Sequence, residues 1–205
     1  MTRKPDSMLP ELVILHELFG AATHEASAAM CRWTNGLITL SLDEVREIPL
    51  ENVCQELDWA HELVTMVVLS LAGEIGGEMI LTFDDQNGRR LAAALLGREP
   101  SVDGEWTALE KSALTETGNI LGCAYMNALT RLVDVELVPS PPYFVQDYGA
   151  SVLEQALVGQ AMTCDQAVIC RTAFHRADEE LNWNVFFLPT LALRKRMENA
   201  LHSAT

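Results

Sequence analysis

Two long stretches with the composition of helices divide the sequence into halves, and each is followed by strand-like segments and a shorter helix. The first stretch, Leu9–Trp33, is rich in alanine and is ended by Asn35-Gly36, residue types that commonly follow a helix. Three segments that are apolar or that alternate with period two then predict strands, and a segment closed by Gly97 predicts a helix. These segments are Leu37–Leu42, Leu63–Leu71, Glu78–Phe83 and Arg89–Leu96.

The second half begins with a helix-start signal. Thr107 is a favourable N-cap residue and Glu110 completes a capping box, so we expect a helix that runs to about Leu132. The first strand after it is stopped by the cluster Pro139-Ser140-Pro141-Pro142, because proline has no N–H to donate to a ladder. The predicted elements are the strands Val135–Val138, Ala167–Phe174 and Trp183–Leu188 and the helix Leu191–His202.

A shift of 99 residues aligns the two halves and lays Glu116 on Glu17. Few residues are identical, so this repeat rests on the order and register of the elements. Each half has too few strands to cover a long helix, and no long flexible linker separates the halves. We therefore predict one pseudo-symmetric α/β domain over residues 1–205, with repeats at about 8–100 and 105–203.

The chain of 205 residues carries 14 basic and 29 acidic residues, and its net charge of −15 repels phosphate backbones and anionic lipid heads. We therefore expect no nucleic-acid partner and no membrane partner. No secretory signal and no membrane-spanning stretch is evident, which predicts a soluble, cytoplasmic protein. The cysteines are odd in number and lack CxxC spacing, which predicts reduced thiols and no metal site. They are Cys31, Cys54, Cys123, Cys164 and Cys170.

One polar stripe on the second long helix is a candidate site. At 100° per residue, Ser112, Glu116 and Asn119 fall on one side of the helix, beside the apolar arc. A carboxylate and a carboxamide one turn apart can hold a water molecule or a phosphoryl oxygen between them. A Glu and an Asn at this spacing are also common on solvated helix surfaces, so the pair alone leaves both interpretations open. Gly118 and Gly122, within the same helix, indicate close packing rather than a phosphate loop.

The pair belongs to a longer pattern, Ser112-x3-Glu116-x2-Asn119-x22-Pro142. This pattern resembles the active-site motif of the CheC, CheX and FliY phosphatases of bacterial and archaeal chemotaxis. The flanking sequences resemble the second repeat of a CheC-type protein, and His16-Glu17-Leu18 and Val45–Leu50 resemble parts of the first repeat. The resemblance covers nearly the whole chain and implies an α+β sandwich, in which two long helices pack on an antiparallel-rich sheet.

The resemblance also implies an activity. Members of this family hydrolyse the aspartyl phosphate of the response regulator CheY without a covalent intermediate of their own. Asn119 would orient the attacking water, and Glu116 would hold a lysine of the regulator or help to position the water. Ser112 would be accessory and Pro142 would shape the strand exit. The protein would need no cofactor of its own, and Mg²⁺ would belong to the regulator. Phosphorylated CheY and a CheD-type deamidase are the implied partners.

The first half departs from the motif. Val13, Glu17, Gly20 and Asp43 occupy the equivalent positions, and only Glu17 matches. Glycine has no side chain to orient water, so we predict a single working site on the second helix, whereas a His24–Glu25 replacement pair is the less favoured alternative. A degenerate first site also fits a second hypothesis, a non-catalytic adaptor that docks receiver domains or CheD. The middle domain of FliM resembles this fold, lacks the Glu/Asn pair and binds partners without catalysis.

Overall fold

The computed structural model describes most of the chain. The described residues are 10–52, 63–71, 75–101, 104–148, 151, 166–176 and 179–204. Cys54 and Cys164 lie outside them. The described cysteines Cys31, Cys123 and Cys170 are free thiols. Within these ranges, none of the helices combines the length and the apolar character that a bilayer span requires.

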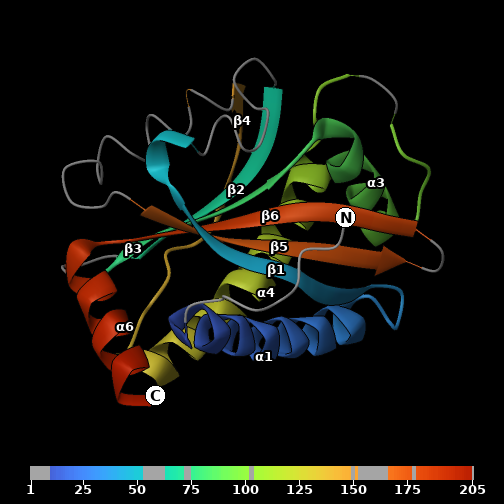
Figure 1. Cartoon of the computed structure of the whole chain (residues 1–205). Coiled ribbons are helices and arrows are strands. Elements are labelled where there is room, and N and C mark those ends of the chain that lie inside the picture. Colours follow the sequence, from blue (N-terminus) through green and yellow to red (C-terminus); the bar gives the residue numbers. More distant parts are fainter. Residues whose placement is uncertain are drawn as a thin grey trace, which may run out of the picture.

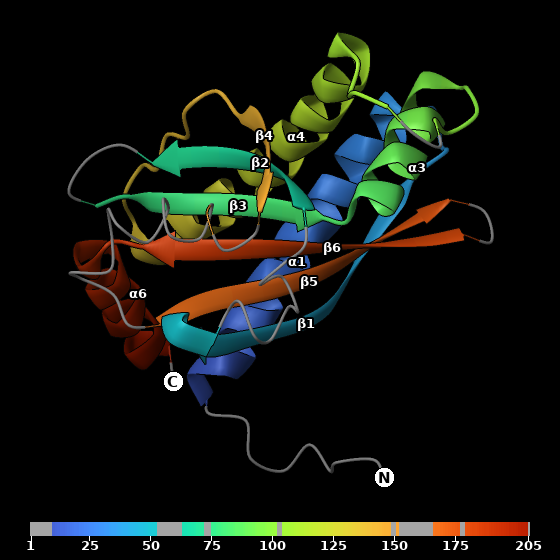
Figure 2. The same ribbon diagram turned by 90° about the horizontal axis from the view of Figure 1, so that it is seen from above.

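A single six-stranded antiparallel sheet is the centre of the fold, and Figure 2 shows its strands in the order β1-β5-β6-β3-β2-β4. If each strand is replaced by its counterpart in the other half (β1 by β4, β2 by β5 and β3 by β6), the same strand order is obtained, read from the opposite edge of the sheet. The predicted pseudo-two-fold repeat is therefore present in the sheet, with β3 and β6 paired at its centre. The strands are β1 (Thr39–Pro49), β2 (Leu63–Leu71), β3 (Gly77–Phe83), β4 (Tyr143–Tyr148), β5 (Gln166–Arg176) and β6 (Glu179–Pro189). The assignment of residues 1–205 to one domain stays a prediction.

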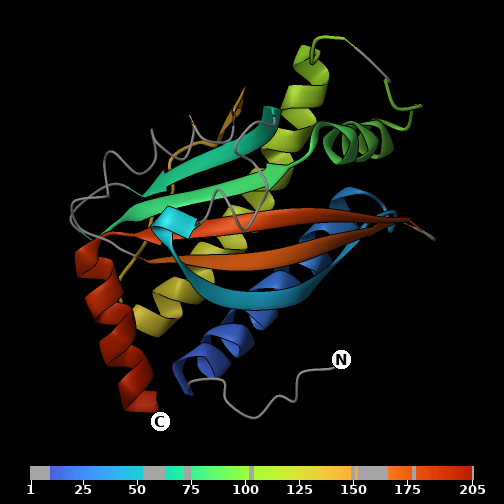
Figure 3. The same ribbon diagram turned by 45° about the horizontal axis from the view of Figure 1, so that its top comes forward.

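Two long helices cover one face of the sheet, as predicted. α1 (Pro10–Trp33) and α4 (Ala108–Val133) lie against each other beneath the strands (Figures 1 and 3). The shorter helices α3 (Asp85–Leu96) and α6 (Leu191–Ala204) lie at opposite ends of the sheet, and a 3-10 turn (Leu50–Asn52) follows β1. The largest hydrophobic cluster fills the space between helices and sheet, and a smaller cluster lies on the opposite sheet face.

The helix boundaries follow from capping residues that the sequence already shows. Asp84 caps α3 by accepting a hydrogen bond from the backbone N–H of Asn87, and Gly97 ends α3 in the left-handed conformation, at φ 62°. The complete capping box of Thr107 and Glu110 begins α4. Asp134, at φ 52°, ends α4.

The predicted strand at Val135–Val138 is wrong. The first strand of the second half is β4, which begins after the prolines rather than before them. Residues 135–138 instead lead from α4 towards the sheet, with the N–H of Leu137 donating to Thr130 Oγ1 of the helix. Ser140 anchors the proline cluster by exchanging hydrogen bonds with Ser70 of β2. Because three of the four residues at 139–142 lack an N–H, regular pairing starts only at Tyr143.

Candidate active site

The polar stripe of α4 lies on the side of the helix that faces away from the sheet. Ser112 and Glu116 are exposed, and Asn119 is half-buried one turn further on. The residues that face the sheet and α1 are buried and form a separate arc that includes Leu121 and Tyr125. The structure thus presents a hydroxyl, a carboxylate and a carboxamide to solvent along a single helix face.

Close packing fixes the position of this helix face. A Cβ added at Gly118 would overlap Val67 of β2, and one added at Gly122 would lie 2.5 Å from Leu69 Cδ2. The glycines therefore let α4 approach the sheet as the sequence predicts. On the other side, the buried Tyr125 hydroxyl is within hydrogen-bond distance of Thr23 Oγ1 of α1, at 2.8 Å, and of Thr172 Oγ1 of β5, at 3.0 Å. α4 is thereby held by β2, α1 and β5 together.

Asn119 lines an open groove between α1 and α4. The groove has a volume of about 520 Å³, and its polar lining includes Glu25 and Arg32 from α1 and Cys123 from α4. An ion pair joins the two helices beside it, with Arg131 Nη2 2.9 Å from Glu25 Oε1. Glu116 and Ser112 do not line the groove but lie on the exposed turns of α4 that precede it.

The orientation of the Asn119 carboxamide is restrained from within its own helix. The thiol of Cys123, one turn later, donates to Asn119 Oδ1 at 3.7 Å. Burial, reinforced by the negative charge of Glu116, raises the pKa of that thiol, so it stays protonated and remains a donor at neutral pH. A raised pKa also makes Cys123 a poor nucleophile. The second lone pair of Oδ1 and the amide N–H groups are left to interact with a molecule in the groove.

Pro142 lies outside the helix that carries the stripe. It is half-buried and directly precedes β4, so it stands at the entry of a strand and not at an exit. β4 contacts α4 next to the beginning of the stripe, where Lys111 Nζ lies 5.5 Å from the centre of the Phe144 ring. Pro142 thus lies at the point where β4 begins.

The equivalent positions of the first half do not form such a stripe. Val13 and Glu17 are exposed on α1, and Gly20 leaves a half-buried backbone position where an added Cβ would meet only Leu42 Cδ2, at 4.0 Å. Asp43 is exposed at an irregularity in β1 and accepts a hydrogen bond from Ser41. In the alternative pair, His24–Glu25, the carboxylate of Glu25 already forms an ion pair with Arg131.

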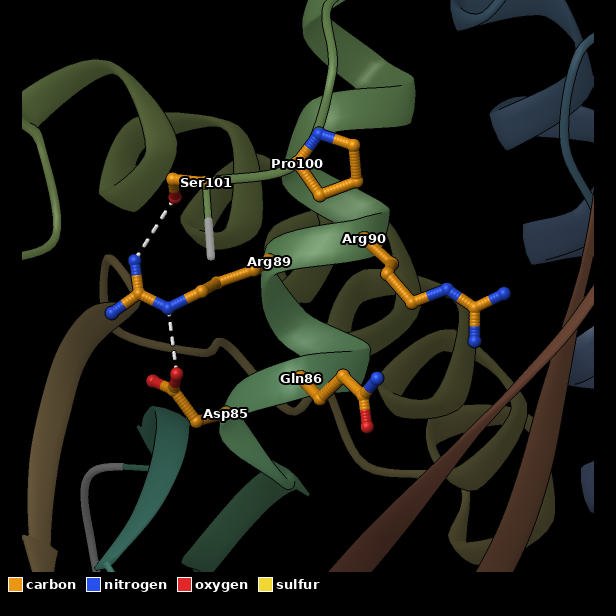
Figure 4. A pocket seen from close by; sticks show the side chains of 6 residues that line it. All are labelled: Asp85, Gln86, Arg89, Arg90, Pro100 and Ser101. Carbon is orange, nitrogen blue, oxygen red and sulfur yellow. Dashed lines mark hydrogen bonds and ion pairs between the residues drawn. The ribbon is translucent and has the colours of Figure 1, made fainter. Parts of the chain in front are cut away.

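A second depression, of about 390 Å³, lies between α3 and the segment that leads to α4 (Figure 4). Its most buried charge is Arg89, whose side chain is 7% exposed. The guanidinium donates to Asp85 at 2.6 Å, to Ser101 at 3.1 Å and to the carbonyl of Gly104 at 2.7 Å, and it lies 4.5 Å from the centre of the Trp106 ring. These contacts use the guanidinium to brace the connection between the halves, so the groove at Asn119 is the better candidate.

The contribution of α1 to the groove was not predicted from the sequence. Glu25 and Arg32 are separated from Asn119 by more than eighty residues, and only the packing of α1 on α4 brings them together. A signal was present, because the 99-residue shift lays Arg32 on Arg131. This correspondence indicates a shared groove only when it is known which faces of α1 and α4 pack against each other.

Comparisons with known proteins give relatives over almost the whole chain, although no protein-family profile matches the sequence. The CheY-P phosphatase CheC of Bacillus subtilis is 24% identical over 184 residues, which cover 87% of this chain and 88% of the relative. The CheC1 protein of Halobacterium salinarum is 21% identical over 194 residues, covering 93% of this chain and 95% of the relative.

Solved structures share the fold. FliY of Thermotoga maritima matches with a TM-score of 0.67 at 16% identity, and the match covers 100% of both chains. The middle domain of FliM from Helicobacter pylori matches with a TM-score of 0.67 at 11% identity, covering 94% of this chain and 99% of that domain.

Proposed function

Because the chain belongs to the CheC/CheX/FliY family, we propose that it is a phosphatase that hydrolyses the aspartyl phosphate of a CheY-type response regulator. The relative in B. subtilis carries that activity in its name. The single observation that carries the proposal is the position of Asn119, whose carboxamide is oriented by Cys123 at the edge of an open groove. A groove of this kind suits a partner protein that inserts its own reacting group.

The chemistry requires little from the phosphatase. An acyl phosphate is already activated, so a water molecule placed in line with the P–O bond can attack phosphorus. The new bond joins the water oxygen to phosphorus, the bond to the aspartyl carboxylate breaks, and the water proton leaves with inorganic phosphate or to solvent. Asn119 can orient this water, because its Oδ1 accepts a hydrogen bond while its N–H groups donate to phosphoryl oxygens.

Glu116 and Ser112 act from the exposed turns before the groove. We assign Glu116 to a lysine of the regulator or to the same water, since a carboxylate one turn from Asn119 reaches either. Ser112 is an accessory contact further along the stripe. Pro142 is assigned to shaping the start of β4, not to chemistry.

The magnesium ion of this reaction is assigned to the regulator, and the phosphatase contributes only the side chains of α4 and α1. Mg²⁺ on the regulator would neutralise phosphoryl charge, which leaves positioning of the water to Asn119. A cytoplasmic location follows from a regulator as substrate.

A second candidate function is a non-catalytic adaptor of the same fold, which docks phosphorylated receiver domains or a CheD-type deamidase. Two observations favour it: Gly20 removes the water-orienting residue from the first site, and the fold matches the FliM middle domain. The stripe on α4 keeps all of its polar residues, so phosphatase activity is the better supported proposal.

The test is the decay of a phosphorylated CheY-type regulator of the same organism, followed with catalytic amounts of wild-type protein, Asn119→Ala and Glu17→Ala. We expect wild type and Glu17→Ala to accelerate decay and Asn119→Ala to lose the acceleration with its helix intact, because alanine favours helix. Binding of the phosphorylated regulator without any acceleration by wild type would establish the adaptor instead.

A further inference from the structure

The pseudo-symmetry of the fold places one arginine near the end of each long helix. Arg32 is near the end of α1, and the 99-residue shift lays it on Arg131, near the end of α4. Because α1 and α4 pack on each other, each arginine lies beside the partner helix. Arg32 lines the groove that contains Asn119, so this arginine and the carboxamide face one space from different helices.

The two arginines differ in their partners. Arg131 donates to Glu25 of α1 at 2.9 Å, so a carboxylate neutralises its charge. The guanidinium of Arg32 forms no hydrogen bond or ion pair with any residue in the described ranges. Glu25, the acidic residue that lines the same groove, is already engaged by Arg131. The motif on α4 thus shares its groove with the uncompensated charge of Arg32 from α1. Arg131, on α4 itself, is paired with Glu25.

The chain as a whole, with a net charge of −15, repels anions. An uncompensated guanidinium in such a chain is a local group that attracts them. Its planar N–H groups match two oxygens of a phosphoryl group. An acyl phosphate presents such oxygens, and its transition state spreads negative charge over them.

We propose that Arg32 binds the equatorial oxygens of the regulator's phosphoryl group from the α1 side of the groove, opposite Asn119. This inference rests on the proposed phosphatase function. Arg32 forms no covalent bond, and the bonds that form and break are those of the hydrolysis described above. Asn119 positions the water and Arg32 positions the group that the water attacks, so the site is built from both halves of the chain.

The experiment compares Arg32→Gln and Arg32→Lys with Arg171→Gln. Arg171 is an exposed arginine of β5 and follows Cys170, which faces the helices, so its side chain lies on the opposite sheet face. The two glutamine variants therefore change the net charge equally. We expect Arg32→Gln to lower kcat/KM for the phosphorylated regulator by about 10- to 100-fold, the effect of losing a charged hydrogen-bond donor. Arg32→Lys should recover part of the loss, and Arg171→Gln should match wild type.

Binding measurements separate phosphoryl recognition from general docking. Affinity for the regulator is measured in its phosphorylated and unphosphorylated forms, with Asn119→Ala supplying complexes that do not turn over. Adding Arg32→Gln to that variant should weaken binding of the phosphorylated form alone.

The outcomes distinguish this inference from the proposed function. If Asn119→Ala abolishes acceleration but Arg32→Gln has the wild-type rate, the role of Arg32 is refuted and the phosphatase stands. Equal weakening of both regulator forms would make Arg32 a docking contact and would also refute the inference. If wild type does not accelerate decay, both proposals fail.

Discussion

Replacing Gly118 by alanine tests whether α4 is placed by its contact with β2. Two effects oppose each other at this position. Alanine favours a helix interior over glycine by about 1 kcal/mol. The new Cβ, however, overlaps Val67, a fully buried residue of β2, and overpacking of this kind costs about 1–3 kcal/mol. We expect the second effect to win, with a net loss of roughly 1 kcal/mol and a fall in Tm of about 2–4 °C for a chain of this size.

A matched control is available in the other long helix. Gly20→Ala adds the same methyl group to a helix interior, but its Cβ would meet only Leu42, at an ordinary 4.0 Å. The propensity gain is then unopposed, and the protein should become more stable by up to about 1 kcal/mol.

Chemical denaturation of the two variants, with the double variant Gly118→Ala/Val67→Ala, provides the measurement. Removing the Val67 methyl groups relieves the overlap, so the double variant should lose less stability than the sum of the single variants by about 1 kcal/mol. If Gly118→Ala is stabilised as much as Gly20→Ala, the packing argument is refuted, and with it the reason given for the position of Asn119.

Three further predictions concern the site and its supports. Gly20→Asn, introduced beside Glu17 in the Asn119→Ala background, should restore measurable turnover of the phosphorylated regulator, and no recovery would show that the pair alone is insufficient. Cys123→Ala should lower kcat/KM by about two- to fivefold because the carboxamide of Asn119 loses its restraint, whereas Cys123→Ser should not. Glu110→Gln should destabilise the fold by about 1–3 kcal/mol at pH 7. Burial opposes ionisation of Glu110, but its hydrogen bonds to Thr107 and Ser101 and its ion pair with Arg98 lower its pKa overall. The difference in stability between wild type and Glu110→Gln should therefore persist above about pH 5 and shrink as the pH falls below 4 in denaturation curves.

Local signals in the sequence were sufficient for much of the fold. The start of α4 was predicted because Thr107 and Glu110 satisfy each other's backbone groups, an interaction between residues three apart. The end of α3 was predicted because Gly97 adopts a conformation that suits glycine. The position of β4 was mispredicted because Val135–Val138 has the apolar composition of a strand, whereas the prolines decide where pairing can start.

The candidate site also has one part that the sequence predicts and one part that depends on tertiary packing. Ser112, Glu116 and Asn119 are related by helix geometry, so their common face followed from spacing. The groove did not, because its other wall belongs to α1, and no local rule predicts which turn of α1 lies beside Asn119. The state of Arg32 is also a tertiary property, since it depends on Glu25 being bound to Arg131.

Strands of the first half lie between strands of the second half in the sheet, and this order affects synthesis on the ribosome. Among the described strands β1 pairs with β5 alone, so Thr39 has no strand neighbour until His175 has been synthesised. β2 and β3 can form a hairpin early, but the central pairing of β3 with β6 also waits for the last strand. Pairings between residues so distant in sequence form slowly. β1 therefore lacks its strand partner through most of translation, when we expect the nascent chain to depend most on chaperones.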